Sequence, residues 1–338
     1  MRTPTLRDVA RACRVSPATV SKALSPHEDR CDVSAATREK VRAAARRMGF
    51  APSPSHARRT RRLWRNIGLL WGRFAPFTTG VYHGVLDAIG GRLADRGWRL
   101  LYTPVTSSDA WHEMQMAQRL DGVIAVSHVP DAVLEALVRA HYPAVLLNLR
   151  TSLPLPQFLP DEAAGMRELA GHLAALGHRR VLYMPHRDHG VGHFSESERR
   201  TLLHGECARH GMSVADVAAG RIDAAIAACR AGATAVVCYD WSDAPALVAT
   251  LQAAGMPVPG RVSVACCSDL HWFDLLTPPL TALDIPVRAL AETAADSLLA
   301  QIDGAAAPAA PVLLPTRLRI RGTTGPVTKP RAKTASRR

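Results

Sequence analysis

Short apolar runs alternate with amphipathic helical patterns between residues 66 and 325, and this alternation restricts the fold more than any other feature of the chain. Repeated strand–helix units are typical of parallel sheets covered by helices on both faces. The length of this region suits an α/β body of two parallel-sheet subdomains. The expected strands are Asn66–Leu70, Arg99–Thr103, Gly122–Val126, Ala144–Asn148, Arg180–Met184, Ala235–Tyr239 and Val262–Cys266. The expected helices are Thr79–Arg96, Asp131–Ala140, Glu162–Leu176, Glu196–His210 and Pro245–Ala254.

Positive charge is concentrated at the two ends of the chain. The whole sequence has a net charge of +13, of which residues 1–65 carry +11 and residues 326–338 carry +5, whereas the middle carries −3. A near-neutral body with a basic head is typical of a polyanion-binding module on a soluble domain. The basic end, 326–338, is expected to be disordered and to add non-specific phosphate contacts.

The head has the start and stop signals of three short helices. The first begins at a capping-box pattern in Thr5–Asp8, before apolar residues at i, i+3, i+4 and i+7 spacing. The second, Pro17–Leu24, follows the N-cap residue Ser16 and has proline at its first position. The third starts after Ser34 and ends at Gly49. Three short helices with a tight turn between the first two predict an all-α helix-turn-helix domain.

Eight short motifs are spread from residue 5 to about residue 325. They are Thr5–Ala10, Val15–Lys22, Val33–Arg38, Met48–Pro52, Asp161–Gly165, Leu176–Val181, Gly255–Pro259 and Leu276–Thr281. Together they closely resemble the LacI/GalR family of transcription regulators. The resemblance implies a helix-turn-helix in residues 1–50, a hinge in 51–65, and a periplasmic-binding-protein-like body in 66–325 that binds an effector and dimerises.

The resemblance also implies that Pro17–Leu24 is the recognition helix, with Pro17, Ala18 and Lys22 on base edges in the major groove. The chemistry agrees, because lysine donates to guanine O6 and N7 and alanine offers only an apolar contact. Arg14 stands where the family has a glycine in the turn, and this position needs a left-handed backbone. The expected DNA contacts in the head are Thr5, Leu6, Ser16, Pro17, Ala18, Thr19, Ser21 and Lys22.

The hinge differs from the family pattern at two positions. By the resemblance, it becomes a helix only on DNA, and a leucine wedges into the minor groove; here Arg59 stands at the leucine position and His56 at an alanine position. Arginine enters a narrow minor groove electrostatically but does not replace an apolar wedge. His56 and Arg59 are therefore expected DNA contacts with a weaker kink. The alternative is a disordered basic linker that adds only non-specific affinity.

Several segments that follow strands align with the family's effector site, as expected for ligands at the carboxyl ends of strands. Ser268 and Asp240 stand on the family's aspartate and asparagine, and Leu202 stands on its effector arginine. The expected effector residues are Phe77, Thr78, Arg150, Asp240, Trp241, Ser268 and Asp269. They suit a hydroxyl-rich ligand, through hydrogen bonds and ring stacking. The alternative is that these residues only cap loops and helices.

Three histidines, His186, His189 and His193, lie at i, i+3 and i+7 in a glycine-containing loop. Their imidazoles could converge on Zn²⁺, but the spacing matches no closed site and no cysteine is near. We expect a solvated loop, no metal and no cofactor. The chain also lacks the sequence motifs of α/β-hydrolases, P-loop proteins and dinucleotide-binding folds, so we expect no enzyme.

The cell compartment is expected to be the cytoplasm. The N-terminus lacks the apolar core of a signal peptide, and no run resembles a membrane span. Seven cysteines at irregular spacings favour a reducing compartment, with Cys266 and Cys267 as buried thiols.

The sequence thus predicts a ligand-responsive repressor that binds a palindromic operator in double-stranded DNA as a homodimer. The alternative hypotheses are an architectural DNA-binding protein whose body no longer senses a ligand, and a solute-binding protein without a role on DNA. The effector, the operator, the choice between dimer and tetramer, and the direction of the response are not fixed by the residues.

Overall fold

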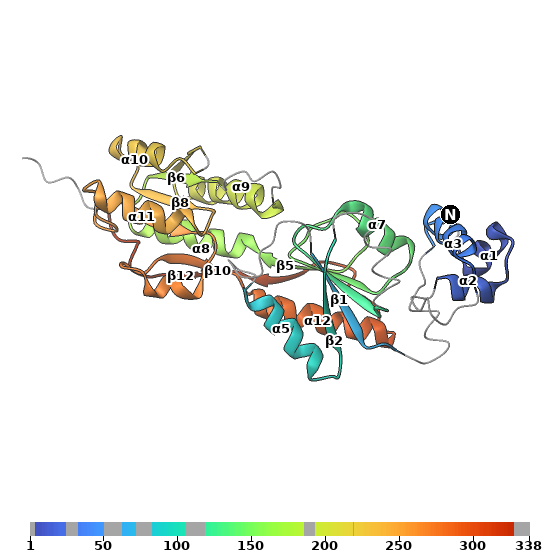
Figure 1. Cartoon of the computed structure of the whole chain (residues 1–338). Helices are drawn as coiled ribbons and strands as arrows, with labels where there is room; N and C mark the ends of the chain where they lie inside the picture. The colour runs from blue at the N-terminus through green and yellow to red at the C-terminus, as the bar shows by residue number, and fades with distance from the viewer. Residues whose placement is uncertain are drawn as a thin grey trace, which may run out of the picture. The chain divides into compact units, whose positions relative to one another are not determined.

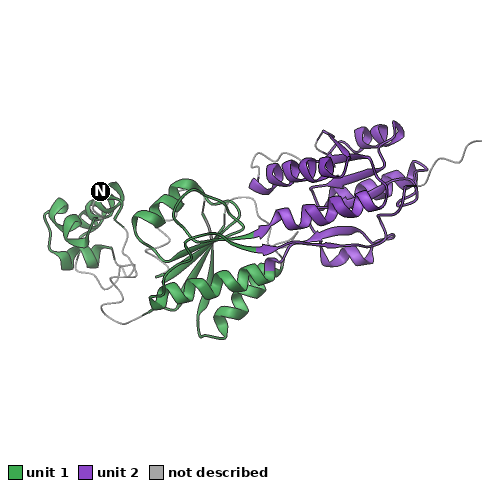
Figure 2. Cartoon of the chain, turned by 180° about the vertical axis from the view of Figure 1, so that it is seen from behind, with its two compact units in different colours: residues 1–77, 84–159, 288–313 green, residues 78–83, 160–287, 314–338 purple. Residues whose placement is uncertain are grey.

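The computed structural model describes residues 4–24, 33–50, 63–71, 83–105, 119–185, 193–218 and 220–327 (Figure 1). These residues form two compact units, coloured separately in Figure 2. Unit 1 contains the head and the first sheet, and unit 2 contains the second sheet. Within the described part of the body the chain passes from one unit to the other after residues 83, 159, 287 and 313. Each unit is therefore built from segments that are far apart in the sequence.

Three helices form the head, as the capping signals predict. They are α1 (Leu6–Cys13), α2 (Pro17–Ala23) and α3 (Ala35–Met48). Thr5 and Asp8 form the expected reciprocal capping box, and Ser16 and Ser34 accept the N–H groups of Thr19 and Thr37. The second helix ends at Ala23, with Leu24 as its C-cap, one residue earlier than expected.

A small apolar core holds the three head helices together. Each helix contributes fully buried side chains, among them Val9, Val20 and Val41. Phe50, which follows α3, closes this core. Burial of a valine-sized side chain contributes about 1.5–3 kcal/mol, so a core of this size holds helices that are too short to be stable alone.

Unit 1 has a six-stranded sheet with strand order β11-β5-β4-β3-β1-β2. Helix α7 lies on one face of the sheet, and α5 and α12 lie on the other (Figure 1). The strands are β1 (Asn66–Trp71), β2 (Arg99–Pro104), β3 (Gly122–Val126), β4 (Ala144–Leu147), β5 (Gln157–Asp161) and β11 (Val312–Pro315). The helices are α5 (His83–Ala94), α7 (Asp131–Arg139) and α12 (Val287–Asp303). The pairs among β1 to β5 are parallel.

Unit 2 has a second six-stranded sheet, with order β12-β10-β9-β8-β6-β7. Its neighbouring strands pair in parallel, except β10 with β12, which are antiparallel. The strands are β6 (Arg180–Met184), β7 (Ser213–Asp216), β8 (Ala235–Cys238), β9 (Ser263–Cys266), β10 (Thr281–Asp284) and β12 (Arg317–Arg319). The helices are α8 (Glu162–Ala175), α9 (Phe194–Arg209), α10 (Ile222–Arg230), α11 (Asp243–Ala253) and the 3-10 turn η3 (His271–Leu275).

Alternate residues of the unit 2 strands point to opposite faces, and both faces are buried. Val181 and Val237 pack with α8 and α9, whereas Leu182 and Val236 pack with α10 and α11. This explains the continuous apolar runs in the sequence, because a parallel sheet covered on both faces has no polar side. The expected buried thiols Cys266 and Cys267 are confirmed.

The structure confirms the predicted fold class and every predicted strand, with ends that differ by at most one residue. Three helix ends differ by two residues, and two of these are the starts of α9 and α11, at Phe194 and Asp243, each two residues earlier than expected. The helix expected over Thr79–Arg96 ends at Ala94, because Gly97 (φ 71°) starts the turn into β2, and residues before 83 lie outside the described ranges. The basic tail does not begin at residue 326, since the Val327 N–H still donates to the Leu176 carbonyl at 3.0 Å. Residues 328–338 lie outside the described ranges.

No helix among the described residues is both long and apolar enough to cross a lipid bilayer.

Candidate DNA-binding surface and effector site

Helix α2 is buried on one side and open on the other. Val20 and Ala23 point into the head core, whereas Pro17, Ala18 and Lys22 are exposed. These three exposed residues are the ones that the sequence assigns to base edges, and Ser21 is exposed with them. The open face is short and carries one cation, so it suits the reading of a few base pairs rather than a broad non-specific contact.

The turn before α2 is fixed by two local features. Arg14 has φ 54° and ψ 44°, which is the left-handed conformation that the sequence predicts for the family's glycine position. The Ser16 hydroxyl accepts the Thr19 N–H at 3.0 Å and lies 2.9 Å from the Thr19 hydroxyl. These contacts set the direction of α2 relative to α1.

The remaining head residues of the predicted set are also placed at helix starts. The Thr5 hydroxyl donates to the Asp8 carboxylate at 2.6 Å and Leu6 packs at the edge of the head core. His56 and Arg59 of the hinge and Phe77 and Thr78 of the expected effector site lie outside the described residues.

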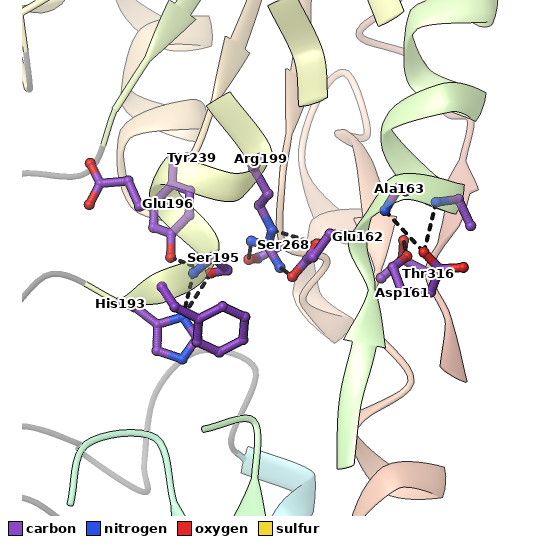
Figure 3. Close-up of polar contacts among 12 residues, drawn as sticks. Asp161, Glu162, Ala163, His193, Ser195, Glu196, Arg199, Tyr239, Ser268 and Thr316 are labelled. Atoms are coloured by element: carbon purple, nitrogen blue, oxygen red, sulfur yellow. Dashed lines mark hydrogen bonds and ion pairs between the residues drawn. The ribbon is translucent and has the colours of Figure 1, made fainter. Parts of the chain in front are cut away.

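In unit 2, a buried ion pair lies at the carboxyl edge of the sheet. Arg199 of α9 donates from Nε and Nη2 to the two carboxylate oxygens of Glu162 at 2.7 and 2.8 Å (Figure 3). Its third nitrogen, Nη1, donates to the Ser268 hydroxyl at 3.3 Å. The side chains of Arg199 and Glu162 are 4% and 0% exposed. All three nitrogens of the guanidinium are therefore used inside the protein.

The Arg199 guanidinium stays charged despite its burial. Burial disfavours the charged form of Arg199, but the attraction and hydrogen bonds of Glu162 outweigh it and raise the arginine pKa above its ordinary value. The guanidinium also lies over the Tyr239 ring, 5.4 Å from its centroid. The result is a neutral, fully bonded unit at the place where the sequence predicts effector residues.

A chain of hydroxyl and imidazole groups lies beside this ion pair. The Tyr239 hydroxyl is 2.8 Å from the Ser195 hydroxyl, which is 2.8 Å from Nδ1 of His193 (Figure 3). His193 is the N-cap of α9 and accepts the Ser195 N–H at 3.3 Å. Together with Ser268, these groups offer neutral hydrogen-bond donors and acceptors.

The other predicted effector residues have varied surroundings. Asp240 accepts hydrogen bonds from the Ser242 N–H and hydroxyl at 2.7 and 2.8 Å, and the half-buried Trp241 packs edge-on against Trp272, with ring centroids 6.3 Å apart. Arg150 is exposed and belongs to unit 1, whereas the other described members of the predicted set belong to unit 2.

Asp269 is held by two arginines. Arg321 donates from two nitrogens to its two oxygens, both at 2.9 Å, and Arg319 donates at 3.2 Å. Side chains of Asp269 and Arg321 are 6% and 8% exposed. This carboxylate therefore joins β12 to the loop after β9, and its predicted role as an effector ligand stays a prediction.

Among the described residues, no three His, Cys, Asp or Glu side chains gather in a way that could hold a metal ion. Of the three histidines weighed for zinc, His193 caps α9, and His186 and His189 lie outside the described ranges.

The ion pair of Arg199 and Glu162 was missed by the sequence reasoning, which looked for an arginine at Leu202. A usable signal was present. In α9 the buried positions include Ser195, Arg199 and Leu203, four residues apart, so the charged residue stands on the apolar face of the helix. A charge on that face indicates a buried partner.

Two family models match the chain. The model of bacterial regulatory proteins of the lacI family matches residues 5–53, which include the three head helices. The model of the periplasmic-binding-protein-like domain matches residues 170–324, which cover most of unit 2. The chain therefore has a lacI-type helix-turn-helix domain followed by a periplasmic-binding-protein-like domain. It is accordingly a DNA-binding transcription regulator with a helix-turn-helix head and a periplasmic-binding-protein-like body.

Several transcription regulators match this chain over almost its whole length. The transcriptional regulator reg1 of Streptomyces lividans is 28% identical, over 95% of this chain and 97% of that protein. The regulator MalR of Streptomyces coelicolor is 29% identical over the same shares. The repressor PurR of Photobacterium profundum is 26% identical, over 88% of this chain and 92% of its own.

Solved structures of regulators have the same fold as this chain. A lac repressor dimer bound to operator and the anti-inducer ONPF matches with a TM-score of 0.67 and 23% identity, over 96% of this chain and 100% of that one. A complex of the regulator CelR with cellobiose matches with a TM-score of 0.66 and 24% identity, over 95% and 99%.

Proposed function

We propose that the chain is a ligand-responsive repressor that binds a palindromic operator as a homodimer. The observation that carries the proposal is the open face of α2, where Pro17, Ala18 and Lys22 are exposed while the opposite side is buried. A helix fixed in this way can present its first turns to base edges. No catalysis is part of this role, and the cytoplasm is its proposed location.

The proposals of a homodimer and of a palindromic operator are supported by related proteins. A solved lac repressor is a dimer bound to operator, and a related PurR is named a repressor. One helix-turn-helix reads one half-site, so a two-fold dimer reads two half-sites in opposite orientation, about one helical turn or a multiple of it apart. In this proposal the hinge residues His56 and Arg59 add contacts near the centre of the operator.

The proposed effector site consists of Trp241, Ser268, Asp240 and the groups beside them, with Phe77, Thr78, Arg150 and Asp269 as further expected ligands. The charge of Arg199 is already balanced by Glu162. An anionic effector would therefore have to displace a buried carboxylate, whereas a neutral hydroxyl-bearing molecule could bond to Ser268 and Tyr239 directly. We infer a neutral, hydroxyl-rich effector. A coupling of about 1–3 kcal/mol between effector and DNA is enough for regulation.

Selection of the purified full-length protein against randomised duplex DNA tests the DNA-binding part. The expected result at near-physiological salt is an enriched palindrome with two half-sites. Enrichment of a single half-site would contradict the dimer. The absence of any enriched motif would favour an architectural DNA-binding protein.

The effector part is tested by thermal unfolding in the presence of neutral sugars and polyols and, separately, of sugar acids and sugar phosphates. We expect a neutral compound to raise the melting temperature and to change operator affinity. Trp241→Ala should abolish that shift, and Trp98→Ala in unit 1 is the matched control that should keep it. A shift only with anionic compounds would contradict the assignment.

A further inference from the structure

Trp64 is the centre of a small basic surface at the amino edge of the unit 1 sheet. The Arg119 guanidinium lies over its ring, 4.1 Å from the centroid, and Arg99 donates from Nη2 to its carbonyl at 3.4 Å. Arg65, the next residue, donates from Nη1 to the Arg96 carbonyl at 3.4 Å. We call Arg65, Arg99 and Arg119 the basic rim.

The basic rim is fixed to the sheet by one buried carboxylate. Asp121 is 1% exposed and accepts the N–H groups of Trp64 and Asn66, each at 3.3 Å. Its own N–H donates to the Asn66 carbonyl at 2.8 Å. Burial raises the pKa of Asp121, and hydrogen bonds from the backbone, including Arg65, oppose that effect. This carboxylate thus orders the backbone of the rim.

The charges of the basic rim are not balanced by ion pairs. Among the described residues, none of Arg65, Arg99 and Arg119 pairs with a carboxylate; the partners of their side chains are main-chain carbonyls and the indole ring. The neighbouring Arg96 differs, because it forms an ion pair with Asp296 and is not counted in the rim. Arg65 and Arg99 are exposed, and Arg119 is half-buried.

Two rim arginines occupy backbone positions that disfavour any side chain. Arg65 has φ 58° and Arg119 has φ 49°, both in the left-handed region where glycine is free of strain. Such strain persists mostly where surrounding structure or function requires it. The side chains at these two positions are therefore retained at a local cost.

The rim also continues a run of arginines from the hinge. In the sequence, Arg58, Arg59, Arg61 and Arg62 precede Leu63, the first described residue of the hinge segment 51–65. Arg99, the first residue of β2, and Arg119, three residues before β3, lie at the same edge of the sheet. The basic character of residues 1–65 therefore extends onto the body.

We propose that the basic rim of Arg65, Arg99 and Arg119 is a second DNA-contacting surface, which binds backbone phosphates next to the hinge. Arginine suits this role because its planar guanidinium binds phosphate oxygens in a bidentate manner. Phosphate contacts carry no base information, so the rim contributes affinity and register rather than sequence preference. The inference rests on DNA binding by the head.

The test compares the full-length protein with the triple variant Arg65→Gln, Arg99→Gln, Arg119→Gln. The measurement is the affinity for selected and for random duplex DNA at several salt concentrations. Each lost phosphate contact should reduce the slope of log K against log salt by about 0.9. The expected reduction is therefore about 2.7 per protomer, equal on both DNAs.

Two further variants separate charge from structure. The matched control, Arg180→Gln, Arg230→Gln, Arg261→Gln, removes three exposed arginines of unit 2 and should keep the wild-type slope. The triple variant Arg65→Lys, Arg99→Lys, Arg119→Lys keeps the charge but loses the guanidinium packing on Trp64. It should retain most of the slope of log K against log salt.

The outcomes are distinct for the rim and for the proposed function. If the rim variant keeps the wild-type salt slope, or if the control variant loses as much slope, the proposal for the rim is overturned. The proposal that the head binds DNA is then unaffected. If the lysine variant also shows the reduced slope of log K against log salt, packing on Trp64 and not charge is responsible. That result would overturn the proposal that the rim binds phosphates. A wild-type protein that binds no DNA overturns both proposals.

Discussion

Arg199 and Glu162 form a two-point ion pair inside unit 2, with both side chains almost completely buried. One partner comes from α9 and the other from the first turn of α8, 37 residues earlier in the chain. The pair therefore joins the two helices that cover one face of the second sheet, and it neutralises the cation at the proposed effector site.

Removing one partner of this pair should be strongly destabilising. Glu162→Ala leaves the Arg199 guanidinium buried without its counter-charge, and such losses cost about 3–5 kcal/mol. The double variant Glu162→Ala, Arg199→Met removes both charges and should recover part of that loss. The measurement is urea unfolding of the full-length protein, followed by a unit 2 signal such as Trp272 fluorescence.

The exposed pair of Glu135 and Arg139 in α7 is the matched control. Its loss in Glu135→Ala should cost about 0.3–0.5 kcal/mol, as for other exposed i, i+4 pairs. A double variant that is as unstable as Glu162→Ala alone would contradict the view that the unpaired charge is the cause.

Arg14→Gly should stabilise the head. The left-handed backbone at this position costs a residue with a side chain about 1–2 kcal/mol relative to its preferred conformation, and glycine adopts it freely. Greater freedom of glycine in the unfolded chain offsets part of this gain, so we expect about 0.5–1 kcal/mol. Amide hydrogen exchange in residues 4–24 of the full-length protein measures it.

The control for this substitution is Arg11→Gly, three residues earlier in the last turn of α1. Glycine inside a helix is unfavourable, so this variant should lose about 1 kcal/mol. Slower exchange in Arg11→Gly, or faster exchange in Arg14→Gly, would contradict the assignment of the left-handed turn.

His178 should make the stability of unit 2 depend on pH. The ring is 2% exposed and bonds to the hydroxyls of Thr234 and Ser263 at 2.9 and 3.0 Å, and burial lowers its pKa from 6.5 to about 4. Between these pH values the unfolded chain takes up a proton that the folded ring does not. The free energy of unfolding should therefore fall as pH drops from 6.5 to 4, by about 3 kcal/mol.

The measurement for His178 is urea unfolding at pH 7 and at pH 4.5, for the wild type and for His178→Gln. The variant lacks the titrating ring, so its stability should fall less over this interval. An equal fall in both proteins would assign the pH dependence to other groups.

The sequence predicted the local structure of the head closely, because its helices start and stop at residues with local causes. The capping box of Thr5 and Asp8 and the left-handed Arg14 depend only on neighbours within a few residues. The buried strands were predicted for a similar reason, since continuous apolar runs have few alternatives in a fold of this class.

What the sequence analysis did not predict depends on long-range contacts. Glu162 and Arg199 are opposite charges on separate helices, and no local pattern pairs them. Asp269 was expected to bind effector, yet its carboxylate is held by Arg321, 52 residues away in the chain. The basic rim was missed because Arg99 and Arg119 meet Trp64 only after three strands have paired.

The central claim is that the open face of α2 reads bases, and Lys22→Ala tests it most directly. Lys22 is exposed on α2, and Lys40→Ala on the exposed side of α3 is the matched control in the same head. Affinities are measured for the selected operator and for random duplex DNA at one salt concentration. The account predicts that Lys22→Ala weakens operator binding by about 1–3 kcal/mol more than random binding, whereas Lys40→Ala changes both equally. An equal loss on both DNAs in Lys22→Ala would contradict the account.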